Sequence, residues 1–436
     1  MSRRPKSPAG RLRLFADTTP LRTADFRRLW LAGIVTVIGG NLTIFAVPVQ
    51  LYALTQNSAY VGLSGIFALV PLIVFGLLGG AWADAMDRRQ LLIIASCGLA
   101  LASVLLWLQA ALGLNNVWLV LGLLSVQQAF FAINSPTRGA AIPRMLPIEQ
   151  LPAANSLNMT VQQFGAIVGP LLAGLMLRWI DLSTLYLIDA VTCLLPIWAT
   201  FRLAPMPATE SADVAGGARW GVGAVLEGFR YLAGNQVVLM SFVVDLIAMI
   251  FGMPRALFPQ MAHESFGSPV SGGTTMALLA AAMSFGAVAG GVFSGWFPRI
   301  SRQGLAVVLA IVVWGVAMVG FGVTGGLARG QAGLVLWIAL VFLAVGGAAD
   351  MVSAAFRSTI LQEVASDDLR GRLQGVFLVV VAGGPRLADA VHGAGAAMVG
   401  TTRTAAGGGV LVVIGVVLAS AAVPAFVRYR VGPAKA

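Results

Sequence analysis

Charged side chains inside long apolar stretches are the residues of this chain best placed to do chemistry. Six charged residues stand among aliphatic and aromatic neighbours: Asp189, Asp245, Arg255, Asp350, Arg386 and Asp389. An ionised group at the centre of a membrane helix costs roughly 2.5–3.5 kcal/mol on insertion scales, so such groups usually face the interior of a bundle. We expect them to couple ion movement or to contact a substrate. The alternative is that they form static buried ion pairs.

Spacing limits which of these charges can meet within one helix. Arg386 and Asp389 are three residues apart, so they share a helix face and can neutralise each other. Gly383, Gly384 and Pro385 precede them and predict a local break of the helix. A carboxylate beside an Arg in a broken helix is a candidate proton site. His392, one turn further on, is a candidate relay for that proton.

The other acids need partners on different helices. Asp245 and Arg255 are nearly three helical turns apart, which is too far for direct contact. Asp350 and Arg357 are seven residues apart, so they can interact only through an intermediate group.

Amide side chains take the place of charges in the first half of the chain. Side-chain amides hydrogen-bond well between membrane helices, so they can line a polar cavity, or they can simply hold helices together. The candidates are Asn41, Gln127, Gln128, Gln162 and Gln163.

The elements that carry these residues are membrane helices. The chain is 58% hydrophobic and only 10% charged, whereas soluble domains are about 25% charged. A membrane-crossing helix needs about 20 apolar residues. Twelve segments qualify and separate into six and six: 28–53, 59–82, 90–112, 116–137, 152–178, 183–203, 236–261, 271–297, 304–325, 331–356, 371–400 and 405–427. We therefore predict an all-α polytopic membrane protein with two six-helix halves.

The polar segments divide the chain further. We expect a basic cytoplasmic tail at 1–25, a first half at 26–203, a linker with an amphipathic helix at 204–235, a second half at 236–428 and a tail at 429–436. Most Lys and Arg residues lie in the tails and in the even-to-odd connections, which places both termini in the cytoplasm. The net charge of +11 therefore reflects topology, and we expect no nucleic-acid partner. Cys97 and Cys193 have no CxxC partner, so we expect no metal site.

A short charged connection joins the second and third segments. Gly79–Arg89 reads GGAWADAMDRR and contains Gly79, Gly80, Asp84, Arg88 and Arg89. The run GGVFSGWFPRISR echoes it at the same place in the second half, with Ser294 where the acid would stand. Asp84 can pair with Arg88 one turn on. The echo indicates duplication of a six-helix unit, and the alternative role of this connection is a solvated topology signal.

The fifth segment carries glycines at close-packing spacing. Gly165, Gly169 and Gly174 flank Pro170 in the run GAIVGPLLAG. Glycines four apart let another helix approach closely, and a proline bends the helix that contains it.

These motifs resemble those of the major facilitator superfamily over about residues 26–430. The loop is similar to its G-x-x-x-D-x-x-G-R-R signature, and the fifth segment resembles its exporter signature. Several stretches resemble the bacterial enterobactin-exporter-like branch of drug:proton antiporters, including AVPVQLYALT at 46–55 and GGPRLADAVHGAG at 383–395. In helix 4, Gln127 and Gln128 stand in a stretch that lacks the Arg of many proton-driven drug exporters.

The resemblance implies specific roles. Asp84 would hold the cytoplasmic gate shut against helix 11, which begins near Gly371 between Arg370 and Arg372. The protein would export a small amphipathic molecule such as a siderophore or a drug, as a monomer in the bacterial inner membrane. The proton gradient would be the energy source, with no cofactor.

Other functions stay open at this point. An uncoupled or cation-coupled facilitator, an importer or a lipid flippase can share the same scaffold. A membrane enzyme or signalling protein would need a catalytic cluster, and the chain has no HExxH motif, no Walker loop and no GxSxG with triad partners. We therefore expect no catalytic residues.

Overall fold

Long helices make up almost all of the described structure, and no strand occurs within it. The computed structural model describes residues 17–207, 234–364 and 367–430. It places the backbone of Asp84 and of residues 367–379, but not their side chains. The first tail up to residue 16 and the predicted amphipathic helix in the linker lie outside the described residues.

The first half begins with a short 3-10 helix, and its long helices then cross the bundle in alternating directions. Its helices are η1 (Thr19–Arg22), α1 (Ala24–Thr55), α2 (Ser58–Ala85), α3 (Arg88–Ala111), α4 (Val117–Met145), η2 (Ile148–Gln150), α5 (Leu151–Met176), α6 (Leu182–Thr192) and α7 (Leu194–Phe201).

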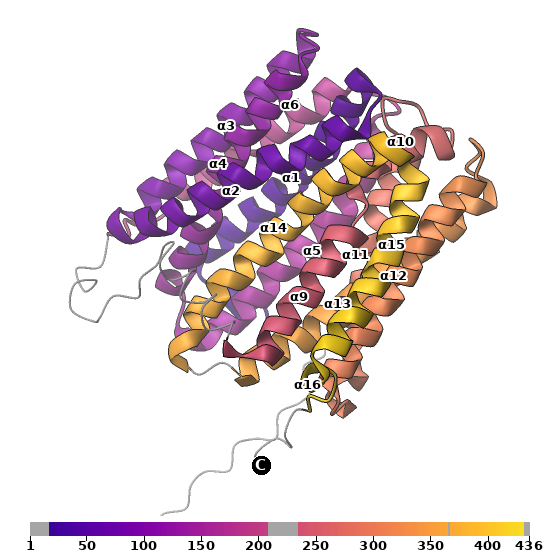
Figure 1. Cartoon of the computed structure of the whole chain (residues 1–436). Helices are drawn as coiled ribbons and strands as arrows, with labels where there is room; N and C mark the ends of the chain where they lie inside the picture. Colours follow the sequence, from indigo (N-terminus) through magenta and orange to yellow (C-terminus); the bar gives the residue numbers. More distant parts are fainter. Residues whose placement is uncertain (1–16, 208–233, 365–366, 431–436) are drawn as a thin grey trace, which may run out of the picture.

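The second half repeats this pattern with more interruptions. Its helices are α9 (Gln236–Gly252), η4 (Arg255–Leu257), α10 (Phe258–Gln260), the π-helical η5 (Met261–Ser265), α11 (Thr274–Val292), η6 (Ser294–Arg299), α12 (Gln303–Leu327), α13 (Gly333–Val364), α14 (Asp367–Val399), α15 (Thr401–Ala422) and α16 (Pro424–Val427). Figure 1 shows the two halves side by side, with α14 lying near the helices of the first half.

Within the described residues, eleven segments are long and apolar enough to cross a membrane. They include the broken pair α6–α7, counted as Leu182–Phe201, and the composite Gln236–Ser265. The remaining predicted segment, 371–400, is the long helix α14, which packs between α2 and α9. Helix α14 is not one of these eleven segments, which are counted over the described residues alone. The predicted all-helical membrane fold is confirmed.

Polar caps explain where several helices begin. Asn57, Asn116 and Asn235 stand before α2, α4 and α9, and each side-chain oxygen accepts a backbone N–H of the first turn. Asn is among the best residues at this position because its oxygen satisfies an amide that has no partner in the helix.

Proline interrupts the second half less than expected. The prediction of a break at Gly383–Pro385 is wrong, because α14 is a continuous helix with Pro385 inside it. Neighbouring helices support this part of α14: a Cβ at Gly384 would meet Met249, and one at Gly383 would meet Leu69. The helix that breaks is the one after Gly252, where Pro254 ends α9 and a 3-10 turn follows.

The two halves meet closely at one end of the bundle. We call the end where α1 begins and α15 ends the tail end, and the opposite end the far end. At the far end Ser58 Oγ donates to Gln260 Oε1 at 2.6 Å, and Tyr52 Oη donates to Glu264 Oε1 at 3.4 Å. Each of these hydrogen bonds joins the first half to the second.

Glycines on α2 show where this helix contacts the second half near the far end. Gly62, Gly65 and Gly76 lie on one face of α2 because their spacings are close to whole helical turns. A Cβ on Gly62 or Gly65 would overlap the backbone of α14 at Asp389, Gly393 or Arg386. A Cβ on Gly76 would have no described atom within 4 Å.

Helices α5 and α11 are in contact near the far end and separate toward the tail end. Met159, Gln163, Pro170 and Gly174 share one face of α5. Near the far end Gly174 is buried, and its Cβ position lies against Ala277 of α11. Toward the tail end the same face is uncovered, since Gln163 is exposed and Met159 is 69% exposed. In its described part, the structure is closed at the far end and open at the tail end.

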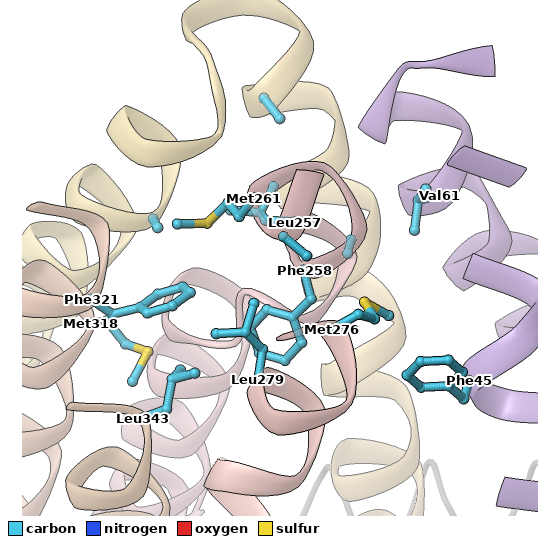
Figure 2. Packing of buried hydrophobic residues seen from close by; sticks show 14 of the residues in the cluster. Phe45, Val61, Leu257, Phe258, Met261, Met276, Leu279, Met318, Phe321 and Leu343 are labelled. Atoms are coloured by element: carbon cyan, nitrogen blue, oxygen red, sulfur yellow. The ribbon is translucent and has the colours of Figure 1, made fainter. Parts of the chain in front are cut away.

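A continuous apolar core stabilises this closed end. Figure 2 shows Phe258, Met276 and Leu279 of the second half packed together, with Phe45 and Val61 of the first half facing them. The rings of Phe258 and Phe321 meet edge to face at 5.9 Å between centroids, a favourable aromatic geometry.

Candidate functional site

A charged pair lies where the second half contacts the first. Arg255 Nη2 lies 3.2 Å from Asp389 Oδ2 and 3.4 Å from the carbonyl oxygen of Pro385. The side chain of Arg255 is 38% exposed and that of Asp389 is 13% exposed. The ion pair therefore joins η4 to α14 and is partly exposed.

Arg386 extends this group across to the first half. Its Nη2 donates to Gln128 Oε1 of α4 at 3.2 Å. The expected neutralisation of Arg386 by Asp389 is thus not the arrangement found, because each residue has its contact on another element. We call Gln128, Arg255, Arg386 and Asp389 the interface cluster.

The interface cluster retains hydrogen-bonding capacity. Asp389 Oδ1 and the Nε atoms of Arg255 and Arg386 are buried and have no hydrogen-bond partner among the described residues. Buried polar atoms are normally paired. Such a cluster can take up a proton, a polar group of a substrate or a rearranged partner.

The backbone explains why these residues meet. Pro254 ends α9, so Arg255 stands at a helix break rather than within a helix. Gly62 and Gly65 bring α2 against the stretch of α14 that carries Arg386 and Asp389. A change at Asp389 therefore acts directly on the contact between the two halves.

A second ion pair is enclosed within the second half. Asp245 of α9 pairs with Arg357 of α13, and their side chains are only 1% and 7% exposed. Arg357 Nε also donates to Ser353 Oγ at 3.2 Å. Asp350 lies close enough to interact electrostatically with both members of the pair. The partners that Asp245 and Arg255 each needed are thus Arg357 and Asp389.

A third polar group, around one of the predicted intramembrane acids, is enclosed within the first half. Asp189 of α6 is 2% exposed, and its Oδ2 accepts from Thr43 Oγ1 at 2.7 Å and Ser103 Oγ at 2.8 Å. Gln127 Nε2 lies 3.3 Å from Ser103 Oγ and 3.5 Å from Asp189 Oδ2. Neutral donors from three other helices surround this carboxylate. Its place inside an apolar segment was the available signal.

The predicted amides fall into different environments. Gln127 and Gln128 are buried and bridge helices, as described above. Asn41 Nδ2 donates to the Val37 carbonyl of its own helix at 2.7 Å. Gln162 and Gln163 are exposed on α5. These last two are therefore the amides of the set that can meet a solute at the open end.

The helix-5 glycines make close contacts on two sides. A Cβ on Gly165 or Gly169 would overlap Val37 or Asn41 of α1, while one on Gly174 would overlap Ala277 of α11. α5 runs without interruption through Pro170. Gly174 thus contributes to the contact between halves, and the other two glycines pack within the first half.

His392 is buried, and its Nδ1 lies 3.0 Å from the Ala388 carbonyl of its own helix. A Cβ added at Gly408 would approach His392 Nε2. The ring thus packs against α15 on the second half's own side.

The charged loop is organised by a residue outside the predicted set. Asp87 caps α3, accepting from Arg89 N at 2.8 Å, and its other oxygen accepts from Met206 N at 3.1 Å. Arg88 donates to the Ala140 carbonyl and Arg89 to the Phe201 carbonyl. The side chain of Asp84 is not described, and neither are those of Arg370 and Arg372, so the proposed gate contact lies outside the described residues. An Asp directly before an apolar run was the available signal for the cap.

The fold is that of a polytopic membrane protein, and the similarities below define its class as a transporter, not an enzyme. The profile of the transmembrane secretion effector family, within the major facilitator superfamily, matches residues 16–430. The chain belongs to this family.

Two curated relatives show the same breadth of similarity. The enterobactin exporter EntS of Shigella boydii serotype 18 is 27% identical over 401 residues, covering 90% of each chain. The exporter of the same name from Escherichia coli O139:H28 is also 27% identical over 401 residues, again with 90% of each chain covered.

Solved transporter structures share the fold. The nucleoside transporter NupG has a TM-score of 0.71 at 15% identity, covering 93% of this chain and 100% of its own. A bacterial homologue of the lysosomal transporter Spinster, inward-facing and unoccupied, has a TM-score of 0.71 at 16% identity, covering 96% and 100%.

Proposed function

We propose that this transporter exports a small amphipathic molecule, of the siderophore or drug class, in exchange for protons. The Arg255–Asp389 ion pair is the observation that carries the proposal, because it lies at the contact between the halves and is partly accessible. The similarity to proteins named enterobactin exporters supports export and the cargo class.

The coupling step follows from the geometry of the pair. Protonation of Asp389 removes the charge that holds Arg255. Arg255 is then free to contact an acidic or polar group of the cargo. In either case the ion pair no longer joins η4 to α14. Since the Asp389 backbone packs on Gly62 of α2, either change alters the contact that closes the far end. This is a two-state element that both the proton and the cargo can bias.

Orientation and direction complete the proposal. The excess of Lys and Arg in the tails supports a cytoplasmic tail end, and the similarity to enterobacterial exporters supports a location in the inner membrane. The described conformation would then be open to the cytoplasm and ready to accept cargo from inside the cell. Gln162 and Gln163 on α5 are exposed amides that we propose can contact the cargo.

Transport by proteoliposomes tests the proposal. Purified protein is reconstituted into liposomes. The liposomes are loaded with enterobactin, the compound in the relatives' name, or with a lipophilic dye. An imposed proton gradient should accelerate cargo movement in the wild type. Asp389→Asn should retain exchange down the cargo gradient and lose acceleration by the proton gradient.

Asp181→Asn is the matched control, because Asp181 is an exposed acid in the connection before α6. It should behave as the wild type does. Acceleration by protons that survives in Asp389→Asn would rule out Asp389 as the coupling residue. Wild-type transport that ignores the gradient would rule out proton coupling and favour a facilitator.

A further inference from the structure

An apolar groove opens on the bundle surface between α12 and α13. It has a volume of about 550 Å³ and runs from the start of α12 toward the middle of both helices. Leu309, Val313 and Val345 form its walls and are 56%, 46% and 41% exposed. These side chains face out of the bundle, where the bilayer surrounds a membrane-spanning helix.

The groove exists because small residues line its floor. Ala306 and Ala310 of α12 and Ala348 and Ala349 of α13 lie between the larger side chains. On α12 the lining residues recur every three to four positions, so they form one stripe along the helix. Two such stripes from adjacent helices leave a channel as wide as an aliphatic chain.

The length of the groove matches one leaflet. Along α12 the stripe from Arg302 to Val313 rises about 17 Å at the helical rise of about 1.5 Å per residue. Half of a hydrocarbon core of about 30 Å is close to that length. An acyl chain that enters at the tail end would therefore fill the groove without crossing the membrane midplane.

A positive charge stands at the mouth of the groove. Arg302 is exposed and is the charged residue of the lining. An Arg guanidinium forms paired hydrogen bonds with a phosphate more readily than with any uncharged headgroup component. Arg302 is also the N-cap residue of α12, and no side chain caps this helix. The amide groups and positive dipole end of a helix start add to the attraction for an anion.

The first half has a side-chain helix cap at the position where α12 has none. The helix at the corresponding position, α3, has Asp87 as its N-cap, and that carboxylate accepts two of its first amides. In the second half a cation stands where the first half has an anion. The start of α12 is thus left with positive character on both its side chain and its backbone.

We propose that this groove binds one acyl chain of an anionic phospholipid, with the lipid phosphate at Arg302. A zwitterionic phospholipid carries the same phosphate, but its ammonium would lie beside a positive side chain and a positive helix start, so the lipid with net negative charge is favoured. The site is separate from the interface cluster, and it holds whether or not the transporter is driven by protons. Its occupant is a lipid of the surrounding bilayer rather than the cargo.

Lipid retention measured by native mass spectrometry tests this site. The protein is released from nanodiscs that contain equal amounts of phosphatidylglycerol and phosphatidylethanolamine. Wild type should retain phosphatidylglycerol preferentially. Arg302→Gln should lower that preference roughly fivefold, the ratio expected for one basic residue near a charged membrane surface. Ala306→Leu, which fills the floor, should lower retention of both lipids.

Arg202→Gln provides the matched control, because Arg202 is an exposed arginine at the same end in the other half. It should leave the preference unchanged. Equal losses in the Arg202 and Arg302 variants would overturn the site and indicate a general surface-charge effect. Retention of a second copy of the protein, abolished by Ala306→Leu, would assign the groove to self-association instead. Displacement of bound lipid by enterobactin would assign it to cargo.

Discussion

At the scale of single residues, different partners stabilise the acids that lie within the membrane segments. Asp389 has a partly exposed arginine, Asp245 has an enclosed one, and Asp189 has hydroxyl and amide donors. The members of a partly exposed ion pair can exchange partners during transport. An enclosed pair loses its partner only at a large energetic cost. Asp389 is therefore the acid best suited to coupling, and Asp245 is better suited to structure.

The Asp245–Arg357 pair should behave as a structural pair. Arg357→Met should destabilise the protein by roughly 3–5 kcal/mol, because it leaves a buried carboxylate without its partner. The double variant with Asp245→Asn should recover part of this loss, with Asp350 accounting for the remainder. Thermal unfolding in detergent measures these changes.

Arg28→Gln is the comparison for that experiment. Arg28 pairs with Asp25 at 3.3 Å, but the two side chains are 41% and 34% exposed. Exposed pairs contribute about 0–1 kcal/mol, so the midpoint should hardly move. An Arg357→Met protein as stable as Arg28→Gln would contradict a structural role for the enclosed pair.

At the scale of helices, glycine decides where the halves can touch. Three glycines on one face of α2 differ only in their distance from the far end. Two of them meet the α14 backbone, and Gly76 meets no described atom. The same helix therefore supplies both a contact region and its internal control.

Gly62→Ala should prevent full closure of the far end, because its Cβ would overlap the Asp389 carbonyl. Transport should fall at least tenfold, and Gly76→Ala should transport as the wild type does. Both variants need comparable amounts in the membrane for the comparison. Equal activity of the two would mean that the α2–α14 contact does not have to re-form during transport.

At the scale of the whole molecule, the contacts between the described parts of the halves represent one conformation of an alternating-access cycle. Hydrogen bonds from Ser58 and Tyr52 join the halves at the far end. Toward the tail end the face of α5 that meets α11 at Gly174 is uncovered. Export requires this far end to open, so these contacts must break once in each cycle.

Cysteine cross-linking tests this requirement. Ser58→Cys and Gln260→Cys are introduced where the two side chains lie 2.6 Å apart, with Cys97 and Cys193 replaced by Ala. Joining the pair with a short thiol cross-linker should abolish transport, and a cleavable linker should restore it on reduction. The single-cysteine proteins, treated identically, should stay active. Transport by the fully cross-linked protein would exclude opening at this end.

The sequence alone determined the membrane fold and its division into repeated halves. Hydropathy, segment length and caps are local properties, so they can be recognised without knowing which helices are neighbours. The buried acids and Arg386 could be listed for the same reason. The structure differs at Gly383–Pro385, where the local preference for a break is overridden by helices packed on both sides of α14.

Only the tertiary structure decided how the charges are grouped. Three pairs join residues that are far apart in sequence and lie on different elements: Arg255 and Asp389, Arg386 and Gln128, and Asp245 and Arg357. The structure likewise shows that Asp87, which caps α3, also accepts a hydrogen bond from the distant Met206 N. Spacing along one helix limits which residues share a face, but the partner of a buried charge is chosen by the packing of different helices.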